Sequence, residues 1–420
     1  MSVMGVVVQF LSKPATLAGL VALIGLVAQK KPVEQVISGT LKITVGFLIL
    51  GGGAGIVTSA ITPLGTLIEK GFGLRGTLPV NGAFVALVQH KFGQQLALIL
   101  FFGFIVNLII ARLTPLKYVF LTGHHSFFMA TVATGVLGLS GLHGWTLVFV
   151  GAVIVGFTSV FFPALTSPYM KRITGGDSFV MGHYGTLSYV TAGYLGRFVG
   201  NPRESTENLR LPAWAGFLKE PLVAMGAVMA VAYWLAAIAA GPAVTGKFSS
   251  DWWPLWSLLQ ALTFAGGIGV ILLGARMILG DTVSAFRGIA QEVVPGARPA
   301  LDCPTVFPYA PNAVLVGYLC STLGGLVVLL IQGAAGWTLI LPSMPLHFFV
   351  GGTAGVFGNA TGGWKGAALG GFVNGLLFTL LAGCLSPVLT TLEPALAGNT
   401  LGDTDFSVIG LILYWVGKLF

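Results

Sequence analysis

Long apolar runs recur along this chain of 420 residues and constrain its fold more than any other feature. A helix needs roughly 20 apolar residues to cross the hydrocarbon core of a bilayer. Such runs lie near residues 15–29, 96–111, 118–139, 145–164, 222–240, 255–279, 313–331, 367–385 and 406–415. Hydrophobic residues make up 55% of the chain and charged residues only 8%, which does not suit a water-soluble surface. The sequence therefore predicts an all-α polytopic membrane protein with about 10–11 transmembrane helices.

Glycine interrupts several of the shorter apolar segments, and the chain holds 61 glycines. Small residues allow membrane helices to pack closely, and broken helices line cavities inside the bilayer. We therefore expect re-entrant hairpins in addition to the full spans.

The chain also repeats itself at an offset of 223 residues. Residues 40–84 align with residues 263–307 without a gap and share ten identities, among them Glu69 with Glu292 and Arg75 with Arg298. A second match pairs GVLGLSGLHGW, which ends at Trp145, with GVFGNATGGW, which ends at Trp364. Six of the ten identities are Gly or Leu, so a shared compositional bias is the alternative interpretation. Repeats of opposite orientation are typical of secondary transporters, and we expect them near residues 36–165 and 259–385 of a single membrane domain covering residues 1–420.

Positive charges gather in alternate loops, and such loops are usually cytoplasmic. They include Lys30–Lys31, Arg112 with Lys117, Lys171–Arg172 and the stretch 197–219. An opposite loop is acidic, at Glu393, Asp403 and Asp405. We therefore expect the N-terminus outside, the C-terminus in the cytoplasm, antiparallel repeats and a cytoplasmic connecting loop at residues 196–219.

Other signals exclude several classes of function. The three cysteines form no CxxC pair, so neither disulfides nor a metal site is expected. No GxxxxGK[ST] phosphate loop occurs, so ATP hydrolysis and a bound cofactor are not expected either. The net charge of +8 is spread over loops, which suits anionic membrane lipid and not nucleic acid. The N-terminus has no signal-peptide pattern.

Polar residues at membrane depth are the candidates for a site, because leaving them unpaired there is costly. Thr58 and Ser59 follow a run of glycines in the segment 51–63, which either breaks a helix and frees backbone N–H groups or packs a helix tightly. His124 and His125 are adjacent and point to different faces, so we expect at most one of them to reach a cavity. His183 and Tyr184 follow a polar turn, although a lone histidine is often an interfacial residue with satisfied hydrogen bonds.

Asp302 is the strongest candidate. Four prolines between residues 299 and 311 prevent a regular helix around it, so the backbone there must line protein or water. A carboxylate in this setting can bind substrate hydroxyls or accept a proton. The alternative is a structural carboxylate that caps the next helix or pairs with Arg298.

These motifs resemble those of the membrane subunit (IIC) of ascorbate-type sugar phosphotransferase systems, the SgaT/UlaA family. The resemblance extends over nearly the whole chain. Its most specific motif is LDCPTVFPYAPNAV at 301–314, and shorter ones are SGTLK at 38–42, GAGIVTS at 53–59, LTGH at 121–124 and GH at 182–183.

The resemblance implies a homodimer in the bacterial inner membrane. Each protomer has a scaffold domain and a mobile core domain that moves the sugar by an elevator-like displacement. A separate cytoplasmic IIB subunit, charged by IIA, phosphorylates the transported L-ascorbate. We expect no fused IIA or IIB domain in this chain, and phosphoryl transfer would belong to the partners.

The family's binding positions fall on Thr58, Ser59, Asn81, Gly82, His124, His183 and Asp302 of this sequence. Phe128 and Tyr184 stand where ascorbate-carrying members present glutamines, so the resemblance suggests a related pentose or polyol nearly as readily as ascorbate. A proton- or sodium-coupled secondary transporter of a small polyol or sugar acid is the alternative, because the two histidines and Asp302 could also relay protons. A receptor or a channel is a further class. An antiparallel repeat argues against a receptor, and saturable uptake with a steep temperature dependence would argue against a pore.

Overall fold

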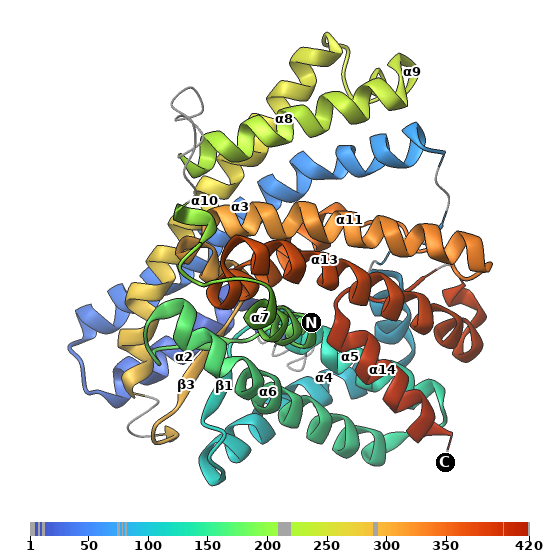
Figure 1. Cartoon of the computed structure of the whole chain (residues 1–420). Helices are drawn as coiled ribbons and strands as arrows, with labels where there is room; N and C mark the ends of the chain where they lie inside the picture. The colour runs from blue at the N-terminus through green and yellow to red at the C-terminus, as the bar shows by residue number, and fades with distance from the viewer. Residues whose placement is uncertain are drawn as a thin grey trace.

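The structure of the chain is a computed structural model, and it describes residues 5–6, 9–10, 13–73, 76–77, 79, 82–208, 220–288, 293–397 and 399–418. Most of these residues are helical (Figure 1). Six helices in the described part of the chain are long and apolar enough to cross a membrane, and three shorter apolar helices accompany them. The predicted helical, multi-pass class is thus confirmed. The six long helices are fewer than the predicted 10–11.

The elements of the first half of the chain are α2 (Pro14–Ala28), α3 (Val33–Gly71), α4 (Gly82–Leu113), β1 (Tyr118–Phe120), α5 (Gly123–Leu139), α6 (Gly144–Thr174), β2 (Val180–Met181) and α7 (Thr186–Val199). Those of the second half are η1 (Thr206–Asn208), α8 (Pro221–Ala240), α9 (Pro242–Thr245), α10 (Trp253–Gly288), β3 (Arg298–Leu301), η4 (Cys303–Tyr309), α11 (Pro311–Ala335), α12 (Met344–Leu346), η5 (His347–Gly351), α13 (Gly352–Leu392), η6 (Pro394–Leu396) and α14 (Thr404–Gly417).

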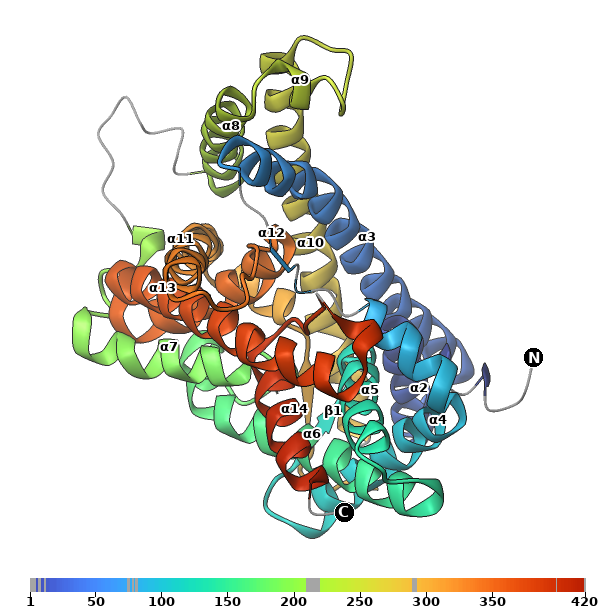
Figure 2. The same ribbon diagram turned by 90° about the vertical axis from the view of Figure 1, so that its right-hand side faces the viewer.

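The helices pack in two groups. In one group α10 packs along α3 and α8, and α2 packs on α3. In the other, α13 lies between α11 and α7, and α4 packs on α6. Figures 1 and 2 show α8 and α9 at one end of the molecule and α6 and the C-terminal end of α14 at the other.

The glycine-rich segment 51–63 lies inside the continuous helix α3, which contains Pro63. A Cβ atom added at Gly53 would lie 2.6 Å from the backbone nitrogen of Ile271 on α10. Gly53 therefore allows close helix packing, which was the second of the two interpretations, whereas a Cβ atom at Gly51, Gly52 or Gly55 would meet no described atom within 4 Å. The helix break, and with it the open N–H groups at Thr58 and Ser59, is not present, and the Ser59 hydroxyl donates to the Ile56 carbonyl at 2.9 Å.

A small parallel sheet, which the sequence analysis did not predict, lies in the second helix group. Its strand order is β1-β3-β2, with Phe120 opposite Ala300 and Met181 opposite Leu301. The Asn107 side chain completes the free edge of β1, because its amide donates to the Tyr118 carbonyl and its oxygen accepts from the Phe120 N–H. The sheet matters for function because parallel strands end at the same edge.

The described part of the predicted connecting loop, up to residue 208, is tied to the helices. Glu207 accepts hydrogen bonds from the backbone N–H groups of Asn312 and Ala313, at the start of α11. The Asn359 side chain on α13 accepts a hydrogen bond from the Thr206 N–H at 3.0 Å. Burial raises the pKa of the Glu207 carboxyl, although the hydrogen bonds that this carboxyl accepts oppose the shift. Residues 209–219 of the loop lie outside the described residues.

Candidate functional site

The three strands of the sheet deliver three polar side chains to one place. His124 lies four residues beyond the end of β1, His183 two residues beyond the end of β2, and Asp302 directly after β3. Because the strands are parallel, these positions meet at the same edge of the sheet. Short strands thus bring together residues that are far apart in the sequence.

A cavity of about 720 Å³ opens at this edge. Its polar lining comes from His124, His125, His183, Asp302, Cys303 and Asp403, together with Lys13 and Thr16. Apolar surface comes from α3, from Phe128, and from Leu346, Phe349 and Val350. Apolar walls with a few convergent polar groups are typical of small-molecule sites.

The two carboxylate oxygens of Asp302 have different roles. Its Oδ1 accepts a hydrogen bond from the Cys303 N–H at 2.7 Å and so caps the 3-10 helix η4. Its Oδ2 lies 3.7 Å from His124 Nε2. Arg298 does not pair with it, and instead contacts Asp177 and the Tyr118 hydroxyl. The structural interpretation of Asp302 therefore holds for one oxygen, whereas the other remains at the cavity.

The protonation of His183 follows from its hydrogen bonds. The Gly185 backbone N–H donates to His183 Nδ1 at 3.0 Å, and the Tyr189 hydroxyl lies 2.9 Å from the same nitrogen. A backbone N–H is only a donor, so Nδ1 carries no proton. The neutral ring therefore holds its proton on Nε2, which makes that nitrogen a hydrogen-bond donor.

Both histidines of the pair at residues 124 and 125 line the cavity, so the expectation that at most one reaches it was wrong. The His125 ring lies 3.8 Å from the His183 ring and stacks on Phe406 at 5.6 Å. His125 is only 4% exposed, and its Nδ1 has no hydrogen-bond partner among the described residues. Both histidines lie in the first turn of α5, which begins at Gly123, and this turn brings His124 near Asp302 and His125 against His183.

The remaining predicted site residues lie in different places. Phe128 lines the cavity one turn beyond His124. Thr58 and Ser59 lie on α3, and the part of α3 that lines the cavity is Phe47 to Gly52. Gly82 begins α4, and Asn81 lies outside the described residues.

Tyr184 lies behind the cavity and is fully buried. Its hydroxyl shares hydrogen bonds with Thr158 at 3.0 Å and Ser159 at 3.4 Å, both on α6. Its ring stacks on Phe120 at 5.2 Å. The Tyr184 hydroxyl therefore already has hydrogen-bond partners within the protein.

The hydrogen bonds of the Tyr184 hydroxyl predict the effect of its removal. We expect Tyr184→Phe to change the Kd for substrate by less than about twofold, while the loss of buried hydrogen bonds destabilises the protein by about 1 kcal/mol. Equilibrium binding and thermal unfolding of the detergent-solubilised variant measure the two effects. A loss of binding without a loss of stability would instead assign the hydroxyl to the substrate.

Asp403 is a cavity residue that the sequence analysis placed in an acidic external loop together with Asp405. The two side chains are 4% and 0% exposed, so they lie inside the protein and not on the surface of that loop. Asp405 accepts hydrogen bonds from the N–H groups of Thr186 and Leu187 and thereby caps the start of α7. Continuing the second sequence match beyond Trp364 aligns Asp403 with Tyr184, which is one of the predicted site residues.

Metal-ligating atoms also cluster here, in three groups whose atoms lie within 4.8 Å of one another. The groups are His124, His125 and Asp302; His125, His183 and Asp403; and His183, Asp302 and Cys303. Two of them need His183. While its Nδ1 accepts the Gly185 N–H, the Nε2 of His183 suits a hydrogen-bond donor to an oxygen ligand better than a metal ligand in these two groups. The group of His124, His125 and Asp302 does not depend on His183.

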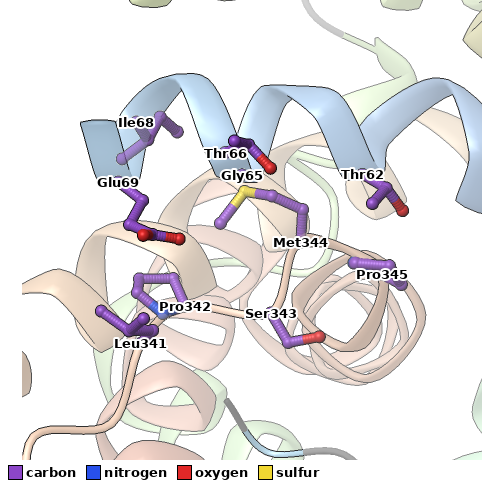
Figure 3. A pocket seen from close by; sticks show the side chains of 10 residues that line it. All are labelled: Thr62, Gly65, Thr66, Ile68, Glu69, Leu341, Pro342, Ser343, Met344 and Pro345. Atoms are coloured by element: carbon purple, nitrogen blue, oxygen red, sulfur yellow. The ribbon is translucent and has the colours of Figure 1, made fainter. Parts of the chain in front are cut away.

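A second, smaller pocket of about 200 Å³ lies between α3 and the segment Leu341–Pro345. Figure 3 shows Thr62, Thr66 and Glu69 on α3 facing Met344 and the neighbouring prolines. Its lining holds no histidine, and Glu69 forms an ion pair with Lys70 at 2.7 Å. The larger cavity therefore has the richer chemistry.

Comparison with known proteins places these features in context. Residues 9–405 match the family described as the PTS system sugar-specific permease component. The chain is also 26% identical, over 455 aligned positions, to the ascorbate-specific PTS system EIIC component of Mycoplasma pneumoniae. That alignment covers 95% of this chain and 68% of the relative.

Proposed function

The chain belongs to the sugar-specific permease components of the phosphotransferase system, and we propose that it carries L-ascorbate or a related pentose or polyol for phosphorylation by a separate IIB subunit. The observation that carries this proposal is the meeting of His124, His183 and Asp302 at one wall of the large cavity. The ascorbate-specific relative supports the substrate class.

The chemistry of the cavity suits a polyhydroxylated solute. The Asp302 carboxylate accepts hydrogen bonds from substrate hydroxyls, and His183 Nε2 donates one to a substrate oxygen. Phe128 and Phe349 offer apolar surface to the C–H faces of a sugar. Each group has a partner in a polyol, so buried polar groups do not remain unsatisfied when the substrate is bound.

We further propose that the site lies between two inverted repeats, and strand pairing supports this. Thr77 forms a parallel bridge with Ile340, and Pro79 forms one with Thr400. These bridges match the sheet pairs of Ala300 with Phe120 and of Leu301 with Met181. Residues 77 and 300 differ by 223, the offset of the first sequence match, and residues 79 and 301 differ by 222. Residues 120 and 340 differ by 220, and residues 181 and 400 by 219, the offset of Trp145 and Trp364.

Backbone conformations support the same correspondence. At the offset of 219, Gly144 at the start of α6 corresponds to Gly363 in α13, and both have positive φ, 58° and 61°. Pro168 in α6 corresponds to Pro387 in α13. A shared compositional bias would not place glycines with positive φ at corresponding positions of both halves, because a positive φ is a specific requirement of the backbone at that position. The cavity draws residues from both halves, as expected for a site at a repeat interface.

The two helix groups give the proposed motion a physical basis. We propose that the group of α2, α3, α8 and α10 is the scaffold that forms the homodimer. The group of α4 to α7, α11, α13 and α14 would then be the core that carries the substrate. In an elevator-like displacement the core slides against α3 with the bound sugar.

Phosphorylation would make the transport unidirectional. We propose that the N-terminus lies outside the cell and the C-terminus in the cytoplasm, where IIB, charged by IIA, meets the substrate. A phosphate ester carries two added negative charges and does not suit a cavity lined by Asp302 and Asp403. The product would therefore leave and not rebind.

An ion-coupled secondary transporter is the alternative, and the unpaired His125 Nδ1 and Asp403 Oδ1 atoms favour it as sites for a proton. The hydrogen bonds of His183 do not favour an ion-coupled transporter. This histidine cannot bind a second proton while the Gly185 N–H donates to its Nδ1.

Uptake measurements separate the two functions. Cells expressing the chain are given labelled L-ascorbate, pentoses and pentitols, with and without the cognate IIB and with and without a protonophore. The proposal predicts that uptake requires IIB and that a brief protonophore treatment leaves most of it intact. Uptake without IIB that collapses with the protonophore would support the ion-coupled transporter.

A further inference from the structure

We infer that Asp403 contacts the substrate and makes the site selective for uncharged polyols over anionic sugar acids. The inference rests on the proposed function, because it specifies which substrates of that class the cavity prefers.

The first observation is the position of the Asp403 side chain. Asp403 lines the large cavity, is 4% exposed, and offers an oxygen within 4.8 Å of ligand nitrogens of His125 and His183. It reaches the cavity from the turn that precedes α14, whereas Asp302 comes from the end of β3. Both carboxyl groups therefore come from the second half of the chain, on separate elements.

The second observation is that Asp403 lacks the usual structural role for its position. Aspartate at the N-cap of a helix normally accepts a hydrogen bond from an N–H group in the first turn. The Asp403 side chain makes no such bond to α14. Its Oδ1 has no hydrogen-bond partner within the described parts of the chain, although it is buried. An unpaired buried carboxylate oxygen is costly and requires a partner that the protein itself does not supply.

The third observation is the backbone of Asp403. Its φ is 67° and its ψ is 143°, a conformation that favours glycine. Lys30 is the other non-glycine residue with positive φ among the described residues. A strained, buried residue with an unsatisfied side chain is characteristic of a functional site, since glycine would relieve the strain.

The charge of the cavity then sets the kind of ligand. Its acidic lining residues are Asp302 and Asp403, and its one lysine, Lys13, is exposed, so its buried part holds two carboxyl groups. A polyol hydroxyl donates a hydrogen bond to such an oxygen and adds no charge. L-ascorbate is a monoanion at neutral pH, and a like charge in a poorly solvated site is strongly disfavoured.

The test is equilibrium competition between xylitol and L-ascorbate on the purified full-length protein in detergent. We expect the wild type to bind xylitol more tightly than L-ascorbate. Asp403→Asn removes the charge and keeps the shape of the side chain, so it should shift the ratio of the two Kd values toward ascorbate by tenfold or more. Asp403→Gly should shift the ratio in the same direction and unfold at a temperature at least as high as the wild type, since glycine accepts the backbone conformation. Asp251→Asn, an exposed loop substitution, should leave the ratio unchanged.

The outcomes distinguish this inference from the proposed function, because binding is measured without IIB. If both Asp403 variants bind with the wild-type ratio, Asp403 does not select the substrate and the inference is overturned, while the proposed function stands. A wild type that prefers ascorbate likewise overturns it. A wild type that binds neither ligand would contradict the proposed function together with the inference.

Discussion

Replacement of Asp302 by asparagine is expected to reduce substrate uptake by at least a hundredfold while the protein still inserts into the membrane. The amide oxygen of asparagine can continue to accept the Cys303 N–H, so the cap of η4 is preserved. The other oxygen, which faces the cavity near His124, becomes an NH₂ group. That change replaces a charged acceptor with a donor in front of the substrate hydroxyls, and hydrogen bonds to charged groups are the stronger ones. Initial uptake rates, normalised to the amount of folded protein in the membrane, measure the loss.

Asp177→Asn is the matched control for this substitution. Asp177 is an exposed aspartate whose partners are Lys171 and Arg298. Exposed ion pairs contribute little to stability, so uptake by this variant should stay within about twofold of the wild type. Wild-type uptake by Asp302→Asn would remove Asp302 from the binding site.

Gly317→Val is expected to prevent correct assembly of the second helix group. Gly317 lies where α11 crosses η5 and α13. A Cβ atom at this position would lie 2.3 Å from the Gly351 carbonyl oxygen and 2.7 Å from the Gly355 Cα. Both neighbours are backbone atoms, which cannot move aside as a side chain can. Overpacking in a dense interior typically costs 1–3 kcal/mol, and a clash with the backbone at a helix crossing should exceed that range. We expect little or no monodisperse protein by size-exclusion chromatography and a lowered unfolding temperature in any that remains.

Gly266→Val on α10 is the comparison for this prediction. A Cβ atom at Gly266 meets no described atom within 4 Å. This variant should therefore keep its yield and unfold within a few degrees of the wild type. Equal yields for the two variants would show that the α11–α13 crossing tolerates a side chain.

The helices were predictable from local sequence, because a membrane span is a property of one continuous segment. The apolar runs at 222–240, 313–331 and 406–415 lie within α8, α11 and α14. The predicted span at 118–139 is less accurate, because it contains a strand and then helix α5. Strands of two to four residues leave no detectable periodicity, and their pairing joins segments about 120 residues apart or more.

The candidate site was predictable in its residues but not in its arrangement. His124, His183 and Asp302 stood out because each is polar within an apolar stretch, and the sheet explains why they meet. Asp403 was missed because a carboxylate in a short loop between apolar segments has the same local pattern whether it is exposed or buried. Thr58 and Ser59 were placed at a helix end because consecutive glycines suggest a break, whereas Gly53 serves the packing of α3 on α10.

The chemical form of the solute inside the cell tests the proposed function most directly. Cells expressing the chain with its cognate IIB and IIA are given a labelled pentitol or L-ascorbate, and mass spectrometry identifies the accumulated product. We expect a sugar or polyol phosphate that appears only with IIB and disappears in Asp302→Asn. Unmodified solute that accumulates without IIB would contradict the proposed function, and would make the protein an ion-coupled carrier with the fold of this family.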